Sequence, residues 1–63
     1  MTYFNVTVTN IKDGRERHVY NYIKYVEFDA ACDMAILFFA DGYKATYNLN
    51  MWRVTVETIH IIK

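Results

Sequence analysis

The chain has 63 residues, the size of one domain, and a chain this short buries only about 60% of the surface that it exposes when unfolded. Seven Lys and Arg residues balance seven Asp and Glu residues, so the chain lacks the net positive charge typical of nucleic-acid-binding proteins. Cys32 is the only cysteine, which excludes a disulfide within the chain.

Alternating apolar and polar residues predict a first strand over residues 3–11, before the Asp13-Gly14 pair. Asp-Gly between extended runs is typical of a hairpin with a type I′ turn, in which both central residues have positive φ. A second strand is predicted over residues 17–28, but its upstream part, residues 19–23, fits neither face of a regular strand. A β-bulge or a short helical turn would explain this irregularity, and the abundance of Tyr, Val and Ile favours the strand.

A turn at residues 29–33 begins and ends with aspartate, whose side chain can bond to nearby backbone amides. The third predicted strand, residues 34–40, is apolar on both faces. A second Asp-Gly pair, Asp41-Gly42, predicts another hairpin, and a fourth strand follows over residues 43–49.

The fifth predicted strand covers residues 51–62 and changes phase along its length. Trp52 lies on one face, whereas Ile59 and Ile61 lie on the other. This change predicts a bulge near Thr58, or a terminal segment that packs on something else.

Together these runs predict an all-β fold for the single domain, residues 1–63. We expect a single antiparallel five-stranded meander sheet, strongly bent or dimerised through its faces or edges, because an open sheet must cover its apolar face and its edge strands. No apolar run approaches the roughly 18 residues that span a bilayer, and no signal-peptide pattern is visible. The sequence therefore predicts a cytoplasmic protein without membrane contact.

The apolar third strand predicts a homo-oligomer, either a dimer or a tetramer. If Ile36 and Phe38 face the core, then Leu37 and Phe39 face water, which costs about 1.5 to 3 kcal/mol for each side chain. A second subunit would remove that cost. The predicted oligomer contacts are Leu37, Phe39, Ile59 and Ile61.

Turn carboxylates are the candidate chemical groups. In a meander, Asp13 and Asp41 lie at one end of the sheet, where clustered carboxylates could bind Mg²⁺ or Mn²⁺; Asp13 is the candidate catalytic ligand. Aspartate also starts turns, and that ordinary interpretation predicts a protein that is not an enzyme and has no metal and no cofactor. A carboxylate next to Cys32 should raise the pKa of its thiol, which argues against a nucleophile.

Six tyrosines occur in the chain, and tyrosine is common at interfaces because its ring is apolar while its hydroxyl tolerates water. Aromatic rings flanked by basic residues also stack single-stranded bases. We expect the partner-binding residues to be Arg17, Tyr20, Tyr22 and Lys24, on the least regular strand. The expected partner is a protein or, as the alternative, a nucleic acid.

Residues 25–49 (YVEFDAACDMAILFFADGYKATYNL) resemble small orphan β-proteins encoded by phages and other mobile elements. An aspartate-bracketed turn, a strand, Asp-Gly and a second strand carry this resemblance. It implies a non-enzymatic homo-oligomer that acts by stoichiometric contact in the host cytoplasm, as an inhibitor of host defence such as an anti-CRISPR protein. The topology is also similar to PC4-like sheets that bind single-stranded DNA as dimers, without their helix. That second resemblance implies DNA binding, with weak metal-dependent nicking, as the alternative.

Overall fold

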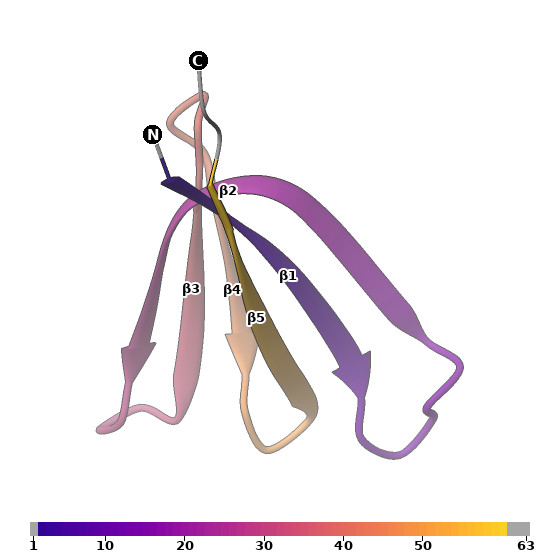
Figure 1. Ribbon diagram of the computed structural model, residues 1–63. Coiled ribbons are helices and arrows are strands. Elements are labelled where there is room, and N and C mark those ends of the chain that lie inside the picture. The colour runs from indigo at the N-terminus through magenta and orange to yellow at the C-terminus, as the bar shows by residue number, and fades with distance from the viewer. Residues whose placement is uncertain (1, 61–63) are drawn as a thin grey trace.

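The computed structural model describes residues 2–60, which form one antiparallel sheet of five strands and contain no helix (Figure 1). The strands are β1 (Thr2–Asn10), β2 (Arg17–Asp29), β3 (Met34–Phe39), β4 (Lys44–Asn48) and β5 (Trp52–His60). The predicted all-β, five-stranded antiparallel sheet is therefore confirmed. In this part of the chain there is no helix long and apolar enough to cross a membrane.

The strand order β4-β3-β2-β1-β5 places β5 beside β1, although β5 follows β4 in the chain. The two edge strands are thus joined by a short turn. Across a flat sheet they would lie about 19 Å apart, which is four strand spacings. The chain from Asn48 to Trp52 spans at most about 14 Å. The sheet must therefore coil until its two edges meet at this turn, where the Tyr47 ring of β4 lies 5.5 Å from the Trp52 ring of β5.

β2 can bend because it carries two extra residues at its centre. Between Tyr20 and Ile23, β2 advances three residues while β1 advances two. Between Ile23 and Tyr25, β2 advances two residues while β3 advances one. Each extra residue is a β-bulge, and bulges bend a strand and increase its twist. The bulge that the irregular alternation predicted is confirmed, and the helical turn does not form.

Ile23 lies at the corner of this bend. It is opposite Phe4 of β1 and also opposite Phe39 of β3. The first half of β2 consequently belongs to one limb of the coiled sheet and the second half to the other. The inner face of the coil holds the fully buried core, which consists of Val6, Val8, Ile23, Ala35 and Leu37.

The predicted orientation of β3 is wrong. Leu37 is fully buried and Phe39 packs against the core, so both point inward, and Ile36 and Phe38 lie on the outer face. Because β3 is apolar on both faces, its sequence alone could not fix which face turns inward. Of the predicted oligomer contacts, Leu37 is buried in the core of a single chain, and Phe39 is half-buried against that core.

β5 has no bulge near Thr58, because its pairing with β1 is continuous from Trp52 to His60. The changed alternation in the sequence means instead that the apolar residues move from the inner face of β5 to its outer face. Ile59 is half-buried on the outer side, opposite Tyr3 of β1. The fourth predicted oligomer contact, Ile61, lies outside the described residues.

Both Asp-Gly pairs lie in hairpin loops, as predicted, but neither loop is a type I′ turn. Residues 11–16 form the first loop, in which the Asn10 side chain accepts bonds from two backbone N–H groups. Residues 40–43 form the second loop, in which Gly42 alone has a positive φ, of 95°. A type I′ turn needs positive φ at both central residues.

The corner position predicts a large effect of Ile23→Ala. Truncating a buried aliphatic side chain costs about 2 to 5 kcal/mol, and a domain of this length has about 3 to 9 kcal/mol in total. We expect urea unfolding followed by far-UV circular dichroism to show a protein that is largely unfolded or has a much lower midpoint. Ile11→Ala, at a half-exposed loop position, is the control, with an expected change below about 1 kcal/mol. Equal midpoints for the two variants would contradict the corner role.

Candidate interaction surface at the bend of the sheet

The bend of β2 brings three of the four loops to one end of the molecule (Figure 1). The Ile11 N–H donates to the Met51 carbonyl, and the Leu49 N–H donates to the Asp33 carbonyl. These bonds tie the β4–β5 loop to the loops before and after β2. The β3–β4 loop lies at the opposite end, beside the start of β1.

The predicted meeting of Asp13 and Asp41 at one end is wrong, because the coiled sheet places these aspartates at opposite ends. Asp13 Oδ1 accepts a bond from the Arg15 backbone N–H at 3.0 Å and lies 3.5 Å from Arg15 Nε. Within residues 2–60, no three His, Cys, Asp or Glu side chains are grouped to hold a metal ion. Asp13 therefore serves its own loop, where Arg15 balances its charge.

Cys32 is exposed in the β2–β3 loop. The Asp29 carboxylate raises the pKa of this thiol through its charge and a hydrogen bond, and Asp33 adds a smaller effect of the same sign. The direction agrees with the sequence-based expectation, although the larger contribution comes from Asp29. A raised pKa leaves little thiolate at neutral pH, so this cysteine is not activated as a nucleophile.

Tyr20, predicted as a partner contact, is half-buried on the inner face. Its hydroxyl shares a hydrogen bond with that of Tyr47 on β4, and its ring centroid lies 5.5 Å from that of Phe39. The Tyr47 ring also contacts Trp52 on β5, with centroids 5.5 Å apart, and Trp52 contacts His18 at 5.7 Å. These rings bridge the space between the two edge strands. Tyr20 is therefore part of the aromatic contact that closes the coil.

The other three predicted contact residues are exposed, but only two lie together. Arg17 begins β2 at the three-loop end, whereas Tyr22 and Lys24 lie at the bend. Tyr22 sits in the first bulge with a φ of 61°, in the left-handed region that most residues avoid. Glycine is the usual residue for that conformation, because a Cβ atom costs about 1 to 2 kcal/mol there.

The Tyr22 ring is held in place by a neighbour on β1. Its centroid lies 5.9 Å from that of Tyr3, in an edge-to-face arrangement with an interplanar angle of 85°. Such a pair contributes about 0.5 to 1.5 kcal/mol beyond the area that it buries. Tyr22 nevertheless remains 58% exposed, so the bend presents an ordered aromatic ring to solvent.

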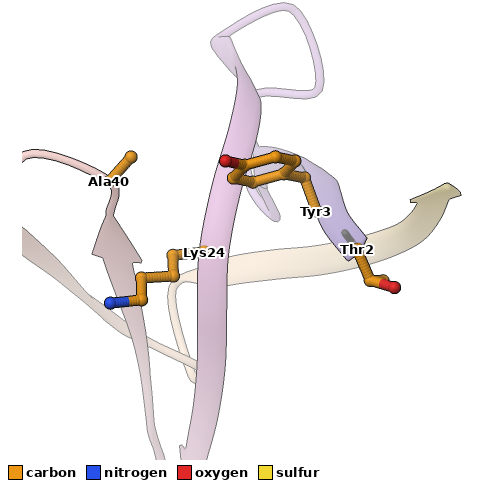
Figure 2. A pocket seen from close by; sticks show the side chains of 4 residues that line it. All are labelled: Thr2, Tyr3, Lys24 and Ala40. Atoms are coloured by element: carbon orange, nitrogen blue, oxygen red, sulfur yellow. The ribbon is translucent and has the colours of Figure 1, made fainter. Parts of the chain in front are cut away.

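A pocket of about 440 Å³ lies beside this pair and is lined by Thr2, Tyr3, Lys24 and Ala40. Figure 2 shows the Tyr3 hydroxyl and the Lys24 ammonium group pointing toward the same side, where Ala40 follows the end of β3. An ammonium group and a phenol both donate hydrogen bonds, so this side suits an anionic or strongly accepting group. We call Tyr3, Tyr22, Lys24 and Ala40 the bend surface.

Sequence reasoning missed Tyr3 and Ala40 as members of this surface. Tyr3 belongs to a regular strand, and its contact with Tyr22 depends on how β2 bends. Ala40 approaches Lys24 because the second bulge shifts the register between β2 and β3. The irregular alternation around Tyr22 was the only sign of this surface in the sequence. It located the bend in β2 but did not indicate which residues of other strands lie beside it.

The Tyr20–Tyr47 contact predicts a loss of stability in alkali. Burial, followed by the hydrogen bond between the Tyr47 and Tyr20 hydroxyls, raises the pKa of Tyr47 to about 12. The unfolded chain ionises near pH 10, so the folded state holds its proton more tightly. The resulting stability is complete below about pH 10 and is lost as the pH rises toward 12. We expect the thermal midpoint to fall less steeply over this range in Tyr47→Phe than in the wild type. Parallel curves for the two proteins would contradict the assignment.

Comparison of the chain with protein-family profiles, with curated proteins and with solved structures finds no match in any of the three. The resemblances to mobile-element β-proteins and to PC4-like sheets therefore stay predictions.

Proposed function

We propose that this chain is a non-enzymatic β-sheet module that binds a macromolecular partner through the bend surface. The observation that supports this most is the conformation of Tyr22. Its backbone occupies a region where glycine is usual, yet the residue is a tyrosine whose ring is 58% exposed. A domain of this length has a total stability of only about 3 to 9 kcal/mol, so such strain is a substantial cost. Strain of this kind is concentrated at functional sites.

The chemistry of the bend surface favours a protein partner with an acidic side chain next to an apolar one. Lys24 supplies a charged donor at the pocket, and the exposed Tyr22 ring supplies a rigid apolar contact. Tyrosine often anchors protein interfaces because ordering its ring costs little conformational entropy. The role that we propose is stoichiometric inhibition, the activity implied by the resemblance to phage-encoded inhibitors of host defence.

Single-stranded nucleic acid is the second candidate partner. It is favoured by the position of Lys24 near the Tyr3 and Tyr22 rings, since an ammonium group beside aromatic rings suits a phosphate next to a stacked base. The balanced charge of the chain argues against extensive phosphate contact.

Two substitutions at the bend test the proposal. Partners are captured from a bacterial lysate and identified, and their affinities are measured by calorimetry. Tyr22→Gly removes the ring while keeping the left-handed backbone, so we expect stability within about 1 kcal/mol of the wild type. We expect partner affinity to fall by at least about tenfold in this variant and in Lys24→Ala, as for truncated interface anchors.

Arg53→Ala and Thr55→Ala, at exposed positions of β5, are the matched controls and should bind like the wild type. The proposal fails if the bend variants retain full affinity, or if the wild type enriches no protein over the bend variants. Fluorescence anisotropy with a labelled single-stranded oligonucleotide, at low and high salt, tests the second candidate. Salt-dependent binding that is lost in both bend variants would favour nucleic acid over protein.

A further inference from the structure

The outer face of β3 is apolar although the core lies on its inner face. Ala35 and Leu37 are fully buried inside, so Met34, Ile36 and Phe38 alternate to the outside, where they are half-buried. Tyr25 of β2 extends this apolar stripe, because its ring centroid lies 5.6 Å from that of Phe38 and it remains 55% exposed. In residues 2–60 the backbones that pack closely belong to sheet neighbours, and the rings that cross the coil, such as Tyr47 and Trp52, lie on its inner face, so no strand covers this outer stripe.

Charged side chains of opposite sign flank the apolar stripe. The pairing register places Glu27 of β2 level with Ile36 of β3 and Thr46 of β4. The adjacent row on the same face holds Tyr25, Phe38 and Lys44. The β2 side of the face is thus acidic and aromatic, and the β4 side is basic. If a second copy of the face is turned so that its β4 side lies over the β2 side of the first, opposite charges meet on both sides.

From this geometry we infer that a second copy of this chain covers the stripe, with the two-fold axis running parallel to β3. That rotation exchanges the β2 side of the face with the β4 side, and it keeps each row of residues at the same position along the strands. Ile36 and Phe38 then pack against the same residues of the second copy. Tyr25 faces Lys44 of the second copy, which suits a cation–π contact. Sheets stacked face to face in this way lie about 10 Å apart, with strands aligned to within about 30°.

Glu27 also approaches Lys44 of the second copy in this arrangement. The two residues lie one row apart, which is about 6.7 Å along the strand, within reach of their extended side chains. Two-fold symmetry forms this contact twice. The other face-to-face arrangement, with the axis across the strands, would bring the Glu27 residues of both copies to the same side of the contact and leave Lys44 without an acidic neighbour. Charge therefore selects the axis parallel to β3.

The contact is small, so the dimer should be weak. Three strands by five residues cover about 14 Å by 17 Å, or roughly 240 Å² in projection. A standard interface buries about 800 Å² of each partner. We expect a dissociation constant between about 100 μM and 1 mM, with half-buried apolar residues providing the attraction and charges setting the orientation.

Charge reversal at the two flanks tests both the dimer and its axis. We expect sedimentation velocity between about 20 μM and 1 mM to show the wild-type mass rising from 7.5 kDa toward twice that value. Glu27→Lys and Lys44→Glu each create two like-charge contacts, so each variant alone should associate at least about tenfold more weakly. In an equimolar mixture of the two variants, each mixed dimer pairs opposite charges at both contacts. Its association should therefore return to within about threefold of the wild type.

The control pair is Arg53→Glu and Glu57→Lys, exposed on β5, which should leave association unchanged both alone and mixed. Well-dispersed NMR spectra would establish that every variant is folded. A wild type that stays at 7.5 kDa up to 1 mM would overturn the inference. Reduced association that the mixture does not restore would overturn the proposed axis. Because none of these residues belongs to the bend surface, the outcome is independent of partner binding.

Discussion

The bend of β2 at Ile23 determines how the other four strands of the sheet are arranged. One strand of 13 residues pairs with β1 through its first half and with β3 through its second half. Two bulges supply the extra residues that turn the strand between those neighbours. Without the bend, the three-residue β4–β5 turn could not connect strands at opposite edges of the sheet. Residues 2–60 form no helix, so the sheet covers its apolar face by coiling on itself.

Two surfaces follow from this solution. The bulge that turns β2 places Tyr22 in a strained conformation and holds its ring outward beside Tyr3 and Lys24. Coiling also turns one face of every strand inward, so the second apolar face of β3 remains outside with Ile36 and Phe38. The first surface is the one that we propose binds a partner, and the second is the one that we propose meets a second copy of the chain.

Local patterns in the sequence predicted the strands and the loop positions because these depend on alternation and on turn residues. The strand order was not predictable in this way, since it depends on a bend whose angle no local pattern specifies. The same limit explains the error at Leu37, where apolar residues on both faces left the phase undetermined. It also explains why Tyr20 was predicted as a partner contact. A tyrosine suits a solvent-exposed interface as well as it suits the hydrogen bond that Tyr20 makes with Tyr47 inside the coil.

The bend implies that one chain closes its own core. Isotope-filtered NOE measurements on a mixture of labelled and unlabelled chains, at about 50 μM, where the proposed dimer is mostly dissociated, test it most directly. We expect the ring contacts of Tyr20 with Tyr47, and of Tyr47 with Trp52, to appear within the labelled chain. If these contacts appeared only between labelled and unlabelled chains, the core would be shared between copies and the account of the bend would be contradicted.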